Sequence, residues 1–186
     1  MQNLLLDELP AATLATRAQA IHARAKAKTE AFELPDGAIA GFFGDYRFLS
    51  NFWLAPIPMY GATYPSVEHA YQAAKTSSPD ERLAILRAAG PAAAKALGRR
   101  VTLRPDWEAV KTHFMLALVR RKFANPVLGD RLIATGNAPI FEETTRWNDT
   151  VWGIVACPGG YRGGNRLGQI LESIRDELMT SQGSGK

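Results

Sequence analysis

The chain has 186 residues, of which 46% are hydrophobic and 22% are charged, so it is long enough to bury a core within one domain. No run approaches the roughly 20 apolar residues of a membrane-spanning helix, and the acidic start of the chain is unlike a signal peptide. We therefore expect a cytoplasmic protein without membrane contact. A net charge of +4 favours an anionic partner, which a phosphate-bearing small molecule satisfies as well as nucleic acid does.

The supply of metal-ligating side chains is small. Cys157 is the single cysteine, so no internal disulfide forms, and three histidines without further cysteines make a poor set of zinc ligands. We expect neither a metal nor a cofactor.

The first 37 residues predict a helical extension. The alanine-rich stretch 10–32 favours a helix, but its apolar stripe is weak, so we expect a surface helix or a loosely packed one. A turn at Pro35-Asp36-Gly37 then leads into a short buried strand at 38–43. The predicted organisation is an extension over 1–37, one domain over 38–180 and a flexible tail over 181–186.

Side chains capable of chemistry are densest in the segment 42–75. Prolines interrupt the stretch 52–60, and a turn follows it, which predicts an irregular hairpin or a loop and not a central strand. Pro65 suits the first position of the helix that comes next.

On that helix, Glu68, Gln72 and Lys75 share one face. Their spacing is compatible with a solvated face and also with a substrate lying between the carboxylate and the ammonium group.

Four more helices are predicted before residue 136, over 78–89, 91–97, 105–124 and 126–135. Lys111 flanks the apolar stripe of the longest one, where a lysine is either structural or catalytic. Arg99, Arg100 and Arg104 form a basic cluster that is either a solvated rim or a phosphate contact.

The last third of the chain predicts two strands, a glycine-rich loop and a final helix. The strands 140–142 and 151–155 are joined by a polar turn, which brings Glu142 and Asp149 together near a hairpin end. The loop 158–165 leads into an amphipathic helix with Asn165 as its N-cap. Glycines expose backbone N–H groups at a helix start, which favours a phosphate cradle, although a mobile loop has the same composition.

Several ordered motifs resemble the YbiA-like, or NADAR, family. They are FLSNF at 48–52, EH-x-Y-Q-x-x-K at 68–75, D-x-x-WG at 149–153 and G-x-N-x-L-G at 163–168, with LGRR, W-x-x-V-K and RxKF between them. The resemblance covers about 41–178. With the predicted elements, it implies an α+β, mainly α, YbiA-like single domain of five to seven helices around a small sheet or hairpins.

The resemblance also implies an enzyme that hydrolyses the N-glycosidic bond of a ribosyl compound. The substrate is either an aminopyrimidine riboside phosphate of riboflavin biosynthesis or ADP-ribosylated guanine in nucleic acid. Breaking this bond builds positive charge at ribose C1, so we assign Glu68 to acid–base catalysis and Asp149 to stabilising the cation or the water. Alternatively a lysine attacks C1 and forms a Schiff base, with Lys75 the first candidate and Lys111 the second.

The other residues expected in the substrate site come from the same motifs. They are Asn51, Tyr71, Gln72, Trp107, Glu142, Trp152, Gly153, Gly163 and Asn165. The aromatic members suit stacking on the base or shielding the site from water, and the glycine loop suits the phosphate. We expect the Glu68 face to line a cleft closed by the Asp149 turn and the glycine loop. A non-catalytic module that binds ADP-ribose or modified nucleic acid is the alternative function.

Overall fold

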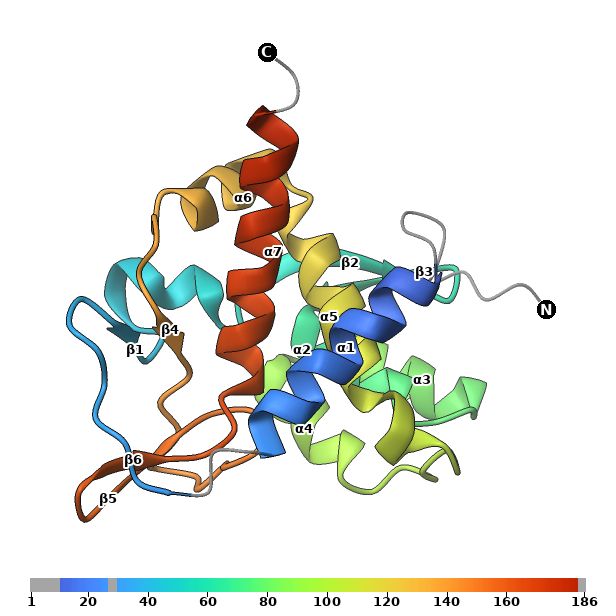
Figure 1. The fold of residues 1–186 in the computed structure, drawn as a ribbon. Coiled ribbons are helices and arrows are strands. Elements are labelled where there is room, and N and C mark those ends of the chain that lie inside the picture. The colour runs from blue at the N-terminus through green and yellow to red at the C-terminus, as the bar shows by residue number, and fades with distance from the viewer. Residues whose placement is uncertain (1–10, 27–29, 184–186) are drawn as a thin grey trace. The chain divides into compact units, whose positions relative to one another are not determined.

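The computed structural model describes residues 11–26 and 30–183. This part contains seven α-helices, one 3₁₀ helix and six short strands, so the prediction of a mainly helical α+β protein is confirmed (Figure 1). The chain falls into two compact units, each built from separate stretches of sequence. Among the described residues, unit 1 comprises 11–16 and 51–122, and unit 2 comprises 17–26, 30–50 and 123–183.

Unit 1 combines a hairpin with four helices. Its elements in chain order are β2 (Leu54–Met59), β3 (Ala62–Ser66), α2 (Val67–Ala74), α3 (Pro79–Leu86), α4 (Pro91–Gly98) and α5 (Trp107–Phe123), of which the last residue belongs to unit 2. The strands β2 and β3 pair antiparallel, with a register shift between Leu54 and Ile57. The irregular hairpin is therefore confirmed, since the shift lies where Pro56 lacks an N–H group for pairing.

Helix α2 is the central element of unit 1, because all eight of its residues are buried. It begins at Val67, two residues later than Pro65 predicted, since Pro65 lies in β3 and Ser66 is the N-cap. The Ser66 hydroxyl accepts a hydrogen bond from the His69 backbone N–H at 3.3 Å. A serine that satisfies a helix-start N–H group outweighs the preference of proline for the first turn.

Unit 2 is built around the last helix. Its remaining elements are β1 (Ile39–Ala40), the 3₁₀ helix η1 (Gly44–Leu49), α6 (Pro126–Ile133), β4 (Ile140–Phe141), β5 (Val155–Cys157), β6 (Gly160–Arg162) and α7 (Arg166–Gly183). Helix α7 has the predicted apolar stripe, with Leu167, Ile170 and Leu171 fully buried. Helix α6 lies beside its C-terminal half (Figure 1).

The predicted hairpin between 140–142 and 151–155 is wrong. Strand β4 instead pairs in parallel with β1, and β5 pairs antiparallel with β6. Residues 151–153 form a turn, because the Asp149 carboxylate oxygen Oδ1 accepts the backbone N–H groups of Val151 and Trp152, both at 2.9 Å. A side chain that captures these N–H groups withholds them from a strand ladder.

The described residues before 38, which are 11–26 and 30–37, include buried and paired side chains. Helix α1 (Ala11–Lys26) begins in unit 1 and continues in unit 2, where Ile21 is buried and Arg17 pairs with Glu177 of α7. Phe32 exchanges two backbone hydrogen bonds of 2.8 Å with Tyr161, so this segment forms part of unit 2. At the other end of the chain, α7 continues to Gly183 and so includes the first residues of the predicted tail, 181–183. Residues 184–186 of that tail lie outside the described residues.

No helix in the described part of the chain is both long enough and apolar enough to cross a bilayer. The predicted cytoplasmic location stays a prediction.

Candidate functional site

Glu68 lies in the first turn of α2 and is only 6% exposed. The Gln72 side-chain amide donates a hydrogen bond of 2.7 Å to its Oε1. Gln72 is buried as well, so its amide holds the carboxylate in one orientation. The first expectation from spacing alone, a solvated helix face, is wrong for these two residues.

The FLSNF motif positions the same helix. The Glu68 backbone N–H donates to the Asn51 carbonyl oxygen at 3.0 Å, and the Asn51 side-chain amide contacts the Met115 sulfur at 3.3 Å. The side-chain oxygen of Asn51 is buried and has no hydrogen-bond partner within the described part of the chain. Asn51 thus links the start of α2, at Glu68, to Met115 of α5.

Lys75 follows α2 directly and is partly buried. Burial lowers the pKa of Lys75 below its ordinary value; Glu68 opposes this shift, and the cations Lys95, Arg99 and Lys111 reinforce it. The Lys75 ammonium also lies 5.8 Å from the centre of the Tyr71 ring. A lowered pKa increases the fraction of neutral amine, which is the nucleophilic form.

Lys111 differs from Lys75 in its partner. Its ammonium forms an ion pair of 2.5 Å with Glu108, one turn earlier on α5. An ammonium held by a neighbouring carboxylate has to leave that partner before it can reach a substrate, so Lys111 is the less suitable nucleophile of the two.

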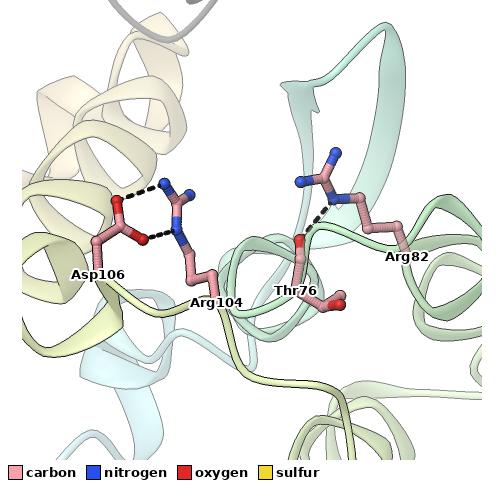
Figure 2. Close-up of polar contacts among 4 residues, drawn as sticks. All are labelled: Thr76, Arg82, Arg104 and Asp106. Atoms are coloured by element: carbon pink, nitrogen blue, oxygen red, sulfur yellow. Dashed lines mark hydrogen bonds and ion pairs between the residues drawn. The ribbon is translucent and has the colours of Figure 1, made fainter.

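The backbone that carries Lys75 is fixed by a polar network. The Lys75 carbonyl accepts the Arg104 backbone N–H at 2.8 Å, and the guanidinium of Arg82 donates to the Thr76 carbonyl at 2.9 Å (Figure 2). Glu81 accepts hydrogen bonds from the Thr76 hydroxyl and from the Thr102 backbone N–H.

The Arg104 guanidinium forms two bonds to Asp106, at 2.5 and 2.8 Å (Figure 2). It therefore has a structural partner, and the predicted phosphate contact of this arginine has no support in the structure.

Two of the aromatic residues predicted to stack on a base belong to the core. The rings of Tyr71 and Trp107 lie 5.0 Å apart, and Trp107 lies 6.1 Å from Phe114. Tyr71 and Trp107 are each 5% exposed, which leaves them little surface for a ligand. Trp152, in unit 2, is only partly buried, so it is more accessible than Tyr71 and Trp107.

Asp149 lies in unit 2, at the turn before Trp152. Its backbone carbonyl accepts the Thr144 hydroxyl at 2.7 Å, and its Oδ1 is held by the turn. Its second carboxylate oxygen accepts no hydrogen bond from any residue that the structure describes, so it is the group available to a substrate or water. Glu68 and Asp149 belong to different units, and the predicted cleft between them stays a prediction.

The helix start predicted to cradle phosphate is engaged by backbone contacts. The N–H groups of Gly164, Asn165 and Leu167 donate to the carbonyl oxygens of Thr150, Gly153 and Trp152, at 2.8, 3.1 and 3.0 Å respectively. These three N–H groups therefore have backbone partners, while the phosphate contact predicted for the rest of the glycine loop stays a prediction.

The glycines of this region have packing roles. A Cβ atom at Gly163 would lie 2.5 Å from the Gly153 carbonyl oxygen, and one at Gly160 would collide with the Phe32 backbone. Gly153 similarly lies against the Glu142 carbonyl oxygen and the Thr144 side chain. These positions admit only glycine because two chain segments approach closely there.

Asn165 also has a structural role. Its side-chain amide donates to the Ile140 carbonyl at 2.8 Å, and its side-chain oxygen accepts the Glu142 N–H at 3.1 Å. This arrangement holds the end of β4 against α7. It also fixes the Glu142 backbone, while the contacts of the Glu142 carboxylate to a substrate stay a prediction.

Sequence reasoning missed Lys95. It lies on α4, four residues before Arg99, and its ammonium is 5.8 Å from the centre of the Phe52 ring. The signal was present, since cations four residues apart share a helix face beside the LGRR motif. No group of three or more His, Cys, Asp or Glu side chains in the described residues is arranged to hold a metal ion.

Comparison with known proteins places this geometry in a family. Residues 41–179 match the NADAR domain. The chain is 38% identical to N-glycosidase YbiA of Escherichia coli (strain K12) over 138 residues, which cover 72% of this chain and 82% of that protein. It is 37% identical to N-glycosidase Npun_R5314 of Nostoc punctiforme over 139 residues, with coverages of 72% and 86%.

A third relative is the riboflavin biosynthesis protein VVA0006 of Vibrio vulnificus, 36% identical over 73% of this chain and 36% of that protein. The NMR structure of Escherichia coli YbiA superposes with a TM-score of 0.65 at 34% identity, covering 81% of this chain and 90% of the other. Relatives named N-glycosidases confirm the prediction of a glycosyl hydrolase. The chain belongs to the NADAR family.

Proposed function

We propose that the protein hydrolyses the bond between ribose C1 and nitrogen in a phosphorylated riboside, of the aminopyrimidine type that arises in riboflavin biosynthesis. The names of its relatives, N-glycosidase and riboflavin biosynthesis protein, support this substrate class. The observation that carries the proposal is the placement of a buried carboxylate, Glu68, and a lysine of lowered pKa, Lys75, at the two ends of one buried helix.

The reaction adds water across the C1–N bond. As this bond breaks, its electron pair moves to the nitrogen, which takes up a proton, and C1 becomes positively charged. We assign Glu68 to this proton transfer, because Gln72 holds its carboxylate in a fixed orientation. Water then forms the new C1–O bond and gives up a proton, and Asp149 stabilises the cation or orients this water.

Covalent catalysis by Lys75 is the second route. The amine attacks C1, the leaving nitrogen departs with a proton, and the ring-opened sugar forms a Schiff base that water hydrolyses. This route needs a neutral amine, which the lowered pKa of Lys75 favours, whereas the ammonium of Lys111 is held by Glu108. Borohydride reduction during turnover separates the routes, because it traps a sugar on Lys75 only in the covalent one.

ADP-ribosylated guanine is the second candidate substrate, since its bond to ribose C1 is of the same chemical type. The test is to incubate the protein with the aminopyrimidine riboside phosphate and, separately, with ADP-ribosylated guanosine and DNA, and to measure the released ribosyl product. Release from either substrate class identifies an N-glycosidase and its preference. Binding without release from all three overturns the proposal and favours a binding module.

A further inference from the structure

We propose that Lys95 and Arg99, on helix α4, bind the phosphate group of the riboside substrate beside Glu68 and Lys75. This assignment rests on the proposed function and names the residues that would make the enzyme specific for a phosphorylated sugar.

Helix α4 is held against α2 at one close contact. A Cβ atom at Gly98 would overlap the Gln72 side chain, so the two helices approach closely at the residue that holds Glu68. Lys95 lies three residues before Gly98, on the same helix face, and Arg99 follows Gly98 directly. The close approach therefore brings both cations to the part of α2 that carries the candidate catalytic groups.

Positive charge accumulates at this place. Three cations, Lys95, Arg99 and Lys111, repel the Lys75 ammonium. Among the described residues, the carboxylate that attracts it is Glu68. Lys111 already has Glu108 as its partner. The remaining cations exceed the neighbouring negative charge, and a bound anion would relieve their mutual repulsion.

Lys95 and Arg99 are available for such an anion. Neither side chain forms a hydrogen bond or ion pair with a residue that the structure describes, and the Lys95 ammonium lies against the Phe52 ring. Lys95 is partly buried and Arg99 is exposed, so a ligand can reach them. An arginine fork and a lysine point charge together suit a phosphate, which accepts several charge-assisted hydrogen bonds.

A structural role at the helix end is the competing explanation. Cations in the last turn of a helix interact favourably with its dipole, and Lys95 and Arg99 lie there. That role predicts a loss of stability on their removal and no change in the preference between substrates. The two explanations thus differ in a measurable quantity.

The experiment compares Lys95→Gln, Arg99→Gln and the double variant with the native protein, using an aminopyrimidine riboside with and without its 5′-phosphate. We expect KM for the phosphorylated substrate to rise about 10- to 100-fold per variant, because each loses a hydrogen bond to a charged group. KM for the unphosphorylated riboside should stay within about twofold. Arg100→Gln, an exposed neighbour, is the matched control and should behave like the native protein.

Equal KM changes for both substrates would overturn the inference, and restored phosphate preference in Lys95→Arg and Arg99→Lys would support it. A parallel measurement with an ADP-ribosyl substrate distinguishes a terminal phosphate from a diphosphate as the bound group. If the native protein cleaves nothing, the proposed function fails. Calorimetric binding of ribose 5-phosphate then tests separately whether Lys95 and Arg99 form a phosphate subsite. Binding that is weakened in the double variant and intact in Arg100→Gln supports the subsite, and binding unaffected by the double variant or undetectable in the native protein overturns it.

Discussion

Helix α2 in unit 1 and the start of helix α7 in unit 2 both carry family motifs rich in polar residues, but they use them differently. Glu68 lies on α2 and Lys75 directly follows this helix, and two of the neighbouring cations, Lys95 and Arg99, form no hydrogen bond or ion pair with a described residue. At the start of α7, the polar groups are engaged by backbone atoms, as the two bonds of Asn165 show. A motif therefore indicates chemistry only where its polar groups have not been used to hold the chain together.

The largest effect should come from Glu68→Gln. This change keeps the shape and the hydrogen bond from Gln72 but removes the ionisable group, so turnover should fall about 100- to 10,000-fold. The measurement is the rate of ribosyl release at saturating substrate, with circular dichroism to verify the fold. Asp80→Asn, which changes an exposed acid in the same unit, should retain native turnover. Near-native turnover of Glu68→Gln would remove Glu68 from the mechanism.

Replacing Lys75 should have the next largest effect if the covalent route operates. Lys75→Met should then abolish borohydride trapping, while Lys111→Met should still be trapped. Because the pKa of Lys75 is lowered, the neutral amine becomes abundant at a lower pH than for an ordinary lysine with its value of 10.5. Trapping should thus increase with pH, with its midpoint below the pH of 10.5 expected for an ordinary lysine. A sugar adduct on Lys111 would reverse the ranking of the two lysines.

Asn165→Ala tests the structural role of the second region. The change leaves the Ile140 carbonyl and the Glu142 N–H without their partner, so the free energy of unfolding should fall by about 2–4 kcal/mol. Urea unfolding measures this loss. If Asn165 mainly bound substrate, stability would persist and KM would rise instead.

Gly98→Ala should disturb the contact between α4 and α2. The added methyl group would displace the Gln72 side chain, with a cost of about 1–3 kcal/mol and a loss of turnover as Glu68 loses its fixed orientation. Gly90→Ala is a matched control on the same helix, because a Cβ atom there meets nothing within 4 Å. Equal stability and equal turnover of Gly98→Ala and Gly90→Ala would show that the close contact between Gly98 and Gln72 does not position Glu68.

Lys122 gives the smallest expected effect within any one pH unit, a dependence of stability on pH. Burial lowers its pKa from 10.5 to about 7, so between these values the unfolded chain binds more protons than the folded one. The free energy of unfolding should therefore increase with pH across this window, by at most about 1.4 kcal/mol per pH unit. Lys122→Met should lose this slope in melts at several pH values. If the free energy of unfolding had the same pH dependence in the native protein and in Lys122→Met, the lowered pKa would not belong to Lys122.

The sequence predicted the local elements better than the partners of their polar groups. The helix predicted from residue 78 does begin there, with the Ser78 hydroxyl accepting the Glu81 N–H, since a helix cap depends on neighbours in sequence. The parallel pairing of β1 with β4 was not recognisable, because it joins residues about a hundred positions apart.

Within the site, the family motifs identified Glu68 and Lys75, whose surroundings fit the proposed chemistry. The predicted phosphate cradle in the glycine loop stays a prediction. Glycine composition shows that a backbone can approach another group, but it does not show whether that group is a ligand or, as at Gly163, a neighbouring carbonyl.

Helix α2 has only eight residues, which is shorter than the roughly 12–15 that an isolated helix needs to persist in water. Its geometry is therefore supplied by the surrounding protein, and a synthetic peptide with the sequence 66–75 should be disordered and inert. The distance between the carboxylate and the amine is thus a property of the folded state alone. Enzyme activity should vanish in the same transition as the helical circular dichroism signal, which makes an activity assay a direct probe of whether unit 1 is intact.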